Sequence, residues 1–403
     1  MDRYLIISAD GHAGADLLGY RPYLASRWHE EFDAWADAFV NPWGDLTGPN
    51  AYRNHDSTRR LAELEADGVV AEVLYPNTIP PFFPSNNLLA PLPTPAEYER
   101  RWAGVQAHNR WLAEFCAEAP GRRAGIAQIF LDDVDAAVRE IRWAHEHGLT
   151  GGMMLPGVPP GATVEPLWSD AYEPIWHTCA DLDMVINHHG GGGIPEFGFD
   201  AASRAIMLVE IPIFSHRALW HLIFAGVFER HPSLKMAMTE QGTGWIPRGL
   251  ASLDWFLGRM RVEDAPEHRF GGEAAAKLSL TPSEYFQRNV WCGASFLRPV
   301  ECEQRYEIGV DRIMWGSDYP HDEGSYPHTT EALRFTFHDV PEPEVHRMLG
   351  LTAAEVYGFD LDLLRPIADR VGPTVAEVAR PLESFPEDST CNAFDLDAIV
   401  RAW

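Results

Sequence analysis

The sequence predicts a (β/α)8 barrel with an insertion after its first strand and an extension at its C-terminal end. Short apolar runs typical of buried strands alternate with helical patterns across roughly 350 residues, and eight such units can be counted. Strand–helix alternation implies parallel pairing, and eight units suggest a closed barrel. An open doubly wound sheet is the rival fold, but no Gly-x-Gly-x-x-Gly follows the first strand, which counts against it.

The predicted strands are short apolar runs, most of which stop at a proline, a glycine or a polar residue. They are 3–9, 71–75, 124–130, 150–155, 184–189, 234–239, 290–293 and 312–316. The main predicted helices are 57–66, 94–119, 134–147, 168–181, 201–230, 245–260, 300–308, 329–337 and 344–349. Within them, Thr94 and Glu97 form a predicted capping box, and Pro212 is expected to break the long helix 201–230.

The barrel is expected to occupy residues 1–360. An insertion at about 14–56 shows no clear period, is rich in Trp, Phe and Pro, and is interpreted as short helical pieces. Aromatic residues of this insertion, at 28–43, and the loop 80–84 are candidates to roof the pocket. Residues 361–403 follow the last repeat and contain several prolines. They are expected to form a tail that packs on the barrel or on a partner subunit.

The composition excludes some classes of partner. The chain has 403 residues, and its 32 Lys and Arg against 59 Asp and Glu give a net charge of −27. This acidic balance argues against binding to nucleic acid or to an anionic membrane. The run 4–7 is too short for a signal peptide, and no run is expected to reach transmembrane length. Five widely spaced cysteines without Cys-x-x-Cys indicate a reduced, cytoplasmic protein.

Acids and histidines stand at the ends of four predicted strands. They are Asp10 and His12 on the first strand, His188 and His189 on the fifth, Glu240 on the sixth and Asp318 on the eighth. In a barrel of this kind the carboxyl ends of all strands gather at one face, where active sites lie. Because Asp10 and His12 are two residues apart, they point the same way on an extended segment. Together with a histidine and Asp318 they would form a mixed nitrogen and oxygen shell for one divalent metal.

Each of these residues also has a purely structural interpretation. Asp10-Gly11 is a common turn dipeptide, a single strand-end histidine is often a hydrogen-bonded core residue, and Glu240 could cap the next helix. Asp318 before Tyr319-Pro320 could equally cap a turn. The joint occurrence at four strand ends of one barrel favours a metal site.

Strand alternation separates the two adjacent histidines of the fifth strand. It places Asn187 and His189 on one side, and Ile186 and His188 on the other. Ile186 is expected to face the helices, so His189 is the preferred ligand.

Four segments resemble one known family: 8–12 (SADGH), 187–191 (NHHGG), 238–247 (MTEQGTGWIP) and 315–321 (WGSDYPH). This is the amidohydrolase-related family, which contains aminocarboxymuconate-semialdehyde decarboxylase, resorcylate-type decarboxylases and assorted hydrolases. The resemblance extends from Arg3 to about Asp360. It implies a metal-dependent barrel enzyme with His12, His189 and Asp318 at ligand positions.

The chain departs from the commoner family pattern at two positions. Asp10 stands where many members have the first histidine of a His-x-His pair, although some decarboxylases have a carboxylate there. Glu240 stands where the decarboxylases carry a histidine. Both departures make the site harder and more anionic, so the expected metal is one divalent ion, with zinc as first choice and manganese as second.

The predicted activity is metal-assisted hydrolysis of a C–N or C–C bond in a small, carboxylated or cyclic substrate. A metal-bound water would have a pKa of about 7, Asp318 would take its proton, and Glu240 would pass a proton to the leaving group. Candidate residues that contact substrate or hold the acids in place are His321, His188, Arg298 (for a substrate carboxylate), Asn77 and Trp245.

Two other functions stay open. One is non-oxidative decarboxylation, in which the metal and Arg298 hold a carboxylated aromatic or unsaturated acid. The other is a catalytically inactive barrel that acts as a binding protein. A homodimer is the expected assembly.

Overall fold

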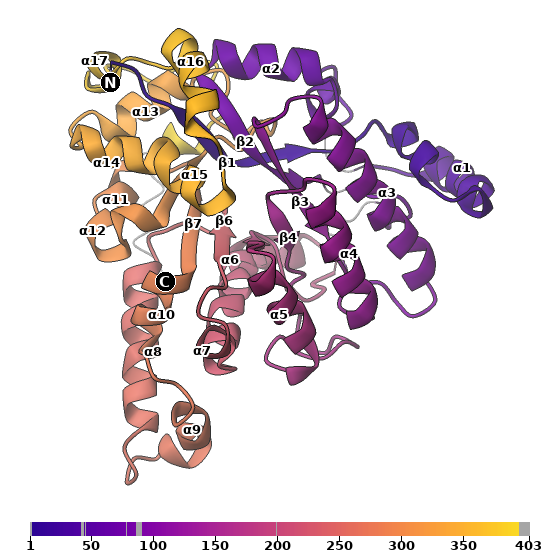
Figure 1. Ribbon diagram of the computed structural model, residues 1–403, viewed down its shortest axis with the longest axis vertical. Helices are drawn as coiled ribbons and strands as arrows, with labels where there is room; N and C mark the ends of the chain where they lie inside the picture. The colour runs from indigo at the N-terminus through magenta and orange to yellow at the C-terminus, as the bar shows by residue number, and fades with distance from the viewer. Residues whose placement is uncertain are drawn as a thin grey trace.

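The computed structural model describes residues 2–41, 44, 46–77, 79–85, 91–198 and 200–394. Within them eight parallel strands pair in chain order, each with the next, and form a nearly closed barrel (Figure 1). The strands are β1 Ile6–Ala13, β2 Val69–Pro76, β3 Arg123–Gln128, β4 Gly152–Met154, β5 Ile186–His189, β6 Met236–Thr239, β7 Val290–Ser295 and β8 Ile313–Gly316. The predicted (β/α)8 barrel is confirmed.

Helices follow the strands in the predicted alternation (Figure 1). They are α1 His29–Ala38, α2 Ser57–Ala66, α3 Tyr98–Ala117, α4 Val134–Glu146, α5 Glu173–Asp181, α6 Ala201–Phe224, α7 Val227–Arg230, α8 Ile246–Met260, α9 His268–Ala275, α10 Pro282–Asn289, α11 Pro299–Cys302, α12 Arg305–Ile308, α13 Thr329–Phe337, α14 Glu342–His346, α15 Thr352–Tyr357, α16 Leu361–Val371 and α17 Val375–Val378. Short 3-10 turns lie at Leu17–Tyr23, Ser26–Trp28, Ala51–Asn54, Asp170–Tyr172, Val310–Arg312 and Asn392–Phe394, and a π turn lies at Arg347–Leu351.

The barrel closes between its first and last strands through the backbone that follows β8. The amide of His12 donates to the carbonyl of Tyr319 over 2.7 Å, and the amide of Asp318 donates to the carbonyl of Asp10 over 2.9 Å. Gly11 and Tyr319 form a parallel bridge. At the same seam, a Cβ on Gly316 would lie only 2.6 Å from Cβ of Asp10, so glycine permits this close approach.

Strand alternation produces two apolar layers. On β5, Ile186 packs in the same cluster as Leu219 of α6, outside the barrel. Its neighbour Val185 packs in a second cluster with Ala237 and Met314 inside the barrel. Asn187 also points inward, because its Oδ1 accepts a hydrogen bond from the hydroxyl of Tyr357 over 2.8 Å. The same alternation turns His189 toward the interior.

Three predicted boundaries are wrong in detail. β1 runs to Ala13, because its pairing with β2 continues beyond a register shift between Ser8 and Gly11, so Asp10 and His12 lie within the strand. α3 begins only at Tyr98, and the expected Thr94–Glu97 hydrogen bonds close the turn that precedes it. Pro212 lies inside an unbroken α6, and the chain turns instead at Gly226, where φ is 71°.

Helix α6 is long and apolar enough to cross a membrane by length and composition, an exception to the expectation that no run reaches that length. Its second half packs on the barrel through buried residues that include Leu219 and Leu222. Its first half leaves apolar side chains exposed, among them Leu208 and Val209.

The insertion after β1 contains short helical turns and α1, as predicted. The aromatic residues of α1 contact the loop at 80–84: Trp35 donates to the carbonyl of Phe83 over 2.9 Å, and Phe32 meets Phe82 edge to face. Trp43, at the end of the aromatic stretch expected to roof the pocket, lies outside the described residues.

The C-terminal extension contacts both ends of the barrel. Tyr4, which precedes β1, donates its amide to the carbonyl of Pro373 over 2.9 Å, and Asn392 donates its amide to the carbonyl of Glu323 over 3.2 Å. Phe385 and Phe394 pack on Phe335 of α13. This segment therefore holds the loop that connects β8 to α13.

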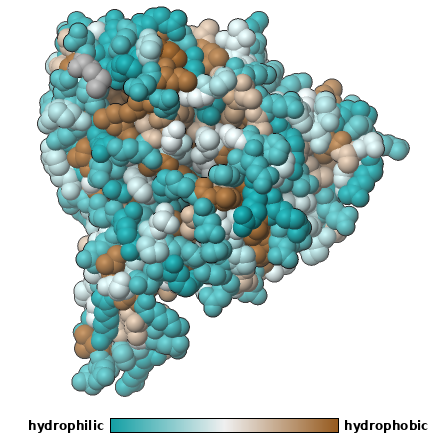
Figure 2. All heavy atoms as spheres, in the orientation of Figure 1, coloured by the Kyte–Doolittle hydropathy of each residue, from teal (hydrophilic) through white to brown (hydrophobic). Residues whose placement is uncertain are grey.

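Helices α8 and α9 project from the barrel at the lower end of the view in Figure 1. This projection exposes large apolar side chains, including Trp255 on α8 and Phe270 on α9, although most of the face seen in Figure 2 is hydrophilic.

A buried ion pair between α2 and β2 contacts the backbone of β1. Arg60 of α2 is fully buried and binds Glu72 of β2 through two hydrogen bonds, of 2.9 and 2.6 Å. Its Nη1 also donates to the carbonyl of His12 over 2.8 Å. The pair therefore fixes the backbone that presents His12.

Replacement of Arg60 with leucine is expected to destabilise the protein by about 3–5 kcal/mol, because it leaves the Glu72 carboxylate buried and without its main partner. Equilibrium denaturation with urea measures this loss. Arg59→Leu, on the exposed side of α2, is the matched control and is expected to change stability by less than about 1 kcal/mol. Equal effects of the two substitutions would contradict this role for Arg60.

Candidate metal centre

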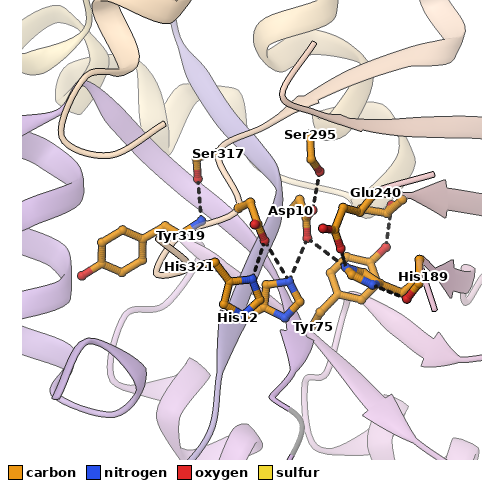
Figure 3. A network of polar contacts seen from close by, with 12 residues as sticks. Asp10, His12, Tyr75, His189, Glu240, Ser295, Ser317, Tyr319 and His321 are labelled. Atoms are coloured by element: carbon orange, nitrogen blue, oxygen red, sulfur yellow. Dashed lines mark hydrogen bonds and ion pairs between the residues drawn. The ribbon is translucent and has the colours of Figure 1, made fainter. Parts of the chain in front are cut away.

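Residues from three strands converge where the strands end. His12 Nε2 lies 3.4 Å from Asp10 Oδ1 and 3.1 Å from Asp318 Oδ1, and His189 Nε2 lies 3.5 Å from Asp10 Oδ1. Figure 3 shows Asp10, His12 and His189 directed toward one another. The structure therefore brings together the residues that the sequence predicted as a metal site.

Four polar atoms of this cluster make no hydrogen bond. They are Asp10 Oδ1, His12 Nε2, His189 Nε2 and Asp318 Oδ2, all of which are buried, and the first three have only the ion-pair contacts given above. A buried polar atom left in this way costs free energy, so such atoms are uncommon in folded proteins. Two carboxylates and two imidazoles are a suitable donor set for a divalent cation, and Asp10, His12 and His189 lie close enough together to share one. The residues present fit a bound metal.

Neighbouring groups orient the donors. Asp10 Oδ2 accepts a hydrogen bond from the hydroxyl of Ser295 at the end of β7, which leaves Oδ1 facing the histidines. His189 Nδ1 lies 3.1 Å from the carbonyl of Gly190, so this nitrogen carries a proton, and the neutral imidazole would offer Nε2 to a metal.

Burial and mutual charge strongly shift the pKa values in the cluster. Burial alone would raise the pKa of Asp10, but contacts with His12 and His189 outweigh it and hold this pKa well below its usual range. Burial opposes the charged form of His189, but Asp10 and Glu240 outweigh it and raise the pKa of His189 to about 9. Burial also raises the pKa of Asp318, whereas His321 and His12 lower it, with a net decrease.

Glu240 stands beside this cluster in a strained backbone conformation. It follows β6 with a φ of 54°, and its Oε2 lies 3.3 Å from His189 Nε2. Asp318 after β8 also has a positive φ, of 58°. The left-handed region is costly for residues with a side chain and is enriched at functional sites. Burial, followed by the nearby charges of Asp318 and Asp10, raises the pKa of Glu240 to about 8.

The loop after β8 contributes two further groups. His321 Nδ1 lies 2.9 Å from Asp318 Oδ1, and its ring stacks on His12 at 4.1 Å between centroids. Glu323 lies with Glu240 and Asp318 in a second group of carboxylates. Sequence reasoning gave Glu323 no role, because its position depends on the turn of this loop. The one available signal is its place five residues after Asp318 in an acidic, proline-containing segment.

The four other predicted substrate-binding residues make contacts elsewhere. His188 points out of the barrel, where its Nδ1 lies 3.4 Å from the carbonyl of Leu155 and burial lowers its pKa to about 4. The structure gives the other three these partners: Trp245 stacks on His216 at 3.8 Å, Arg298 Nε donates to Glu301 Oε2 over 3.0 Å, and Asn77 donates to Asn54 Oδ1.

The structure shows the surroundings of His188 and Arg298 in more detail. His188 does not face the metal-site cluster, because strand alternation turns it toward the helices. Arg298 forms an ion pair with a carboxylate of the protein, since Glu301 follows three residues later on the same helical turn. Their roles toward a substrate stay predictions.

The metal-free protein is expected to become less stable, relative to Glu240→Gln, as the pH rises. A carboxyl whose folded-state pKa is raised from 4.5 to about 8 stabilises the fold fully below pH 4.5, and this contribution is lost as the pH rises through about 8. In chelator-treated protein, the unfolding temperature of the wild type should fall by a few degrees relative to the variant between pH 5 and 9. Glu303→Gln, at an exposed position, is the control; a wild type and Glu240→Gln that change in parallel would contradict the raised pKa.

The chain is similar to known proteins in sequence and in fold. The Amidohydrolase family model matches residues 58–359, which is most of the chain. A gamma-resorcylate decarboxylase from Polaromonas sp. is 26% identical over 224 residues, 53% of this chain and 64% of that protein, which is just under two thirds of its length. A 2-amino-3-carboxymuconate-6-semialdehyde decarboxylase from Dictyostelium discoideum is 23% identical over 327 residues, 76% of this chain and 77% of that protein.

A solved structure with the same fold carries a metal. The dihydroxybenzoic acid decarboxylase from Polaromonas sp. JS666, with bound manganese and the inhibitor 2-nitroresorcinol, superimposes with a TM-score of 0.61 at 18% identity. The match covers 89% of this chain and 98% of that one.

These relatives overturn the predicted hydrolase. The three relatives described above are decarboxylases by name, which agrees with the alternative function inferred from the sequence. The mechanism built on hydrolysis, in which Asp318 activates a water and Glu240 protonates a leaving group, loses its basis. The resemblance to the family is confirmed, and the chain belongs to the amidohydrolase family.

Proposed function

We propose that this chain catalyses the metal-dependent, non-oxidative decarboxylation of a small hydroxylated aromatic acid. The observation that carries the proposal is the set of buried donor atoms without hydrogen bonds on Asp10, His12, His189 and Asp318. Such a set suits a divalent cation at the face of the barrel where catalysis takes place. The choice of reaction follows from the relatives, which are decarboxylases of carboxylated aromatic or unsaturated acids by name.

Manganese is the proposed metal, with zinc as the alternative. Carboxylate oxygens suit manganese, and Glu240 adds a further oxygen donor beside the two of the main cluster. The manganese in the Polaromonas structure supports this choice. When bound, the ion would act as a Lewis acid that binds and neutralises oxygens of the anionic substrate.

Decarboxylation requires a proton and no water. The bond between the ring carbon and the carboxyl group breaks, its electron pair stays on the ring carbon, that carbon takes one proton, and CO₂ leaves. Asp318 and His321 are suited to move this proton. Asp318 is fully buried, whereas His321 is about one-fifth exposed, and 2.9 Å separates their facing atoms. The pair thus links solvent to the inside of the site, and His12 Nε2, 3.1 Å from the same carboxylate oxygen, holds Asp318 in place.

The other expectations from sequence stay predictions. They are a cytoplasmic homodimer that acts on a small molecule and binds neither nucleic acid nor membrane. Exposed apolar residues on the first half of α6, which include Leu208, support an association between copies.

The manganese-loaded protein is expected to convert a dihydroxybenzoate to the corresponding phenol in D₂O, with one deuterium on the carbon that held the carboxyl group. Mass spectrometry and NMR of the product measure this incorporation. Asp318→Asn should reduce the rate by at least about 10²-fold, because the variant cannot deliver the proton in this way. Asp322→Asn, an exposed position on the same loop, is the matched control and should keep its activity.

Two results would contradict the proposal. One is that no member of a panel of hydroxybenzoates and carboxymuconate-like acids loses CO₂ with any added divalent metal. The other is a product that carries an oxygen from ¹⁸O-labelled water at the cleaved bond, which would restore hydrolysis.

A further inference from the structure

One side of the barrel mouth ends in uncharged side chains. The acids and histidines of the metal-site cluster come from β1 and β5, and Glu240 and Asp318 follow β6 and β8. On the strands between β1 and β5, Tyr75 lies at the end of β2, Gln128 ends β3 and Met154 ends β4. The ring of an aromatic anion would be repelled least on this side, away from the carboxylates after β6 and β8.

The side chain of Gln128 points into the barrel. Ile126, two residues earlier on β3, packs in the interior apolar cluster, whereas Ala127 packs in the outer one. Strand alternation therefore turns Gln128 inward, like Ile126. Its register partner on β4 is Met154, which also packs against the interior cluster. Gln128 and Met154 thus line the same wall of the barrel.

Strand pairing places Gln128 close to the level of the metal-site cluster. Gln128 pairs with Met154, and Met154 pairs with Asn187 of β5. Asn187 precedes His189 by two residues, and both point inward. Counted along the ladder, Gln128 therefore lies only one inward position before a ligand candidate.

Tyr75 fills the barrel beneath this position. It pairs with His12 across β1 and β2, and on β2 it lies level with the residue two before Gln128. Its ring is 4.7 Å from the ring of His189 between centroids, and its hydroxyl donates to Thr239 Oγ1 over 2.8 Å (Figure 3). Gln128 thus lies above a filled layer, on the side of the strand ends where a substrate would bind.

The Gln128 side chain has an unused hydrogen-bond donor. Its Nε2 is buried and makes no hydrogen bond with any residue that the structure describes. The backbone of Gln128 is fixed, because its amide donates to Asn109 Oδ1 over 2.9 Å and its carbonyl accepts from Asn109 Nδ2 over 3.0 Å. Asn109 also donates to Glu140 of α4 over 2.8 Å. A buried donor without an acceptor costs free energy, which an oxygen atom of a ligand would recover.

We propose that Gln128 selects substrates that carry a second oxygen substituent on the aromatic ring, by donating its Nε2–H to that oxygen. A phenolic hydroxyl suits the position, because it can accept from Nε2 and can also donate to the amide oxygen of the same side chain. Met154 is the apolar neighbour that the ring would contact. This inference rests on the proposed decarboxylation and specifies its substrate class as benzoates with at least two ring oxygens.

The first test compares the selectivity of the manganese-loaded wild type with that of Gln128→Met, which keeps an unbranched side chain but has no amide. The value of kcat/KM is measured for salicylate and for the dihydroxybenzoates that add a second hydroxyl to it. The ratio of the best dihydroxybenzoate to salicylate should fall by about 10-fold in the variant, because only the second hydroxyl loses a hydrogen bond. Since both substrates are measured on one preparation, the fraction of active enzyme cancels.

The controls separate selectivity from folding and metal content. Gln287→Met makes the same change at an exposed position on α10 and should keep the wild-type ratio. Gln128→Leu measures the same loss with a second side chain, should Gln128→Met fold poorly. Elemental analysis should find the wild-type manganese content in each variant.

A binding measurement needs no turnover. 2-Nitrophenol and its hydroxylated derivatives, which include 2-nitroresorcinol, are titrated by calorimetry into the manganese-loaded proteins. The wild type should bind the best hydroxylated derivative about 10-fold more tightly than 2-nitrophenol, and Gln128→Met should lose this preference.

The outcomes separate the role of Gln128 from the proposed reaction. A wild type that decarboxylates these acids, with a selectivity that neither Gln128 variant changes, would overturn the role of Gln128 and leave the decarboxylase intact. A wild type without preference for a second hydroxyl, in turnover and in binding, would overturn it as well. A binding preference that Gln128→Met abolishes, in a protein that decarboxylates none of the acids, would support the role of Gln128 and overturn the proposed reaction.

Discussion

The candidate site depends on one constraint, the closure of the barrel between β1 and β8. Two backbone hydrogen bonds, from Asp318 to Asp10 and from His12 to Tyr319, join the segment after the last strand to the first strand. They bring Asp318, which follows β8, against Asp10 and His12 on β1. The glycine at 316 permits the contact, because any larger residue would meet Asp10. Without this seam the donors on β1 would face only β5.

The resulting site holds several charged groups of both signs close together. Buried carboxylates and imidazoles face one another through atoms that lack hydrogen bonds, and the pKa values of Asp10, His189 and Glu240 all move far from their usual ranges. Asp10 and His189 stabilise each other's charged forms, whereas the charges of Asp10 and Asp318 oppose ionisation of Glu240, and a cation would relieve this repulsion between carboxylates. Binding energy from the cation is therefore coupled to the stability of the strand ends. The Arg60–Glu72 pair beneath β1 keeps the backbone fixed against this repulsion.

The local sequence pattern was enough to predict the strands, their order and the grouping of Asp10, His12, His189 and Asp318. His189 could be chosen over His188 because Ile186 identified the side of β5 that faces the helices. Features that depend on tertiary contacts were not accessible. Glu323 enters the site only through the fold of its loop. Two local features were also missed, the pairing of Arg298 with Glu301 and the accommodation of Pro212 within α6. The sequence pattern could not distinguish hydrolysis from decarboxylation, because both reactions can use the same metal ligands.

The central claim is that the unpartnered atoms on Asp10, His12 and His189 are ligands of a divalent cation. Crystals of the manganese-loaded protein, measured on both sides of the manganese absorption edge, test it directly. The account predicts an anomalous peak within about 2.0–2.3 Å of Asp10 Oδ1, His12 Nε2 and His189 Nε2. An anomalous map without a peak between these atoms, from crystals that contain manganese elsewhere, would contradict it.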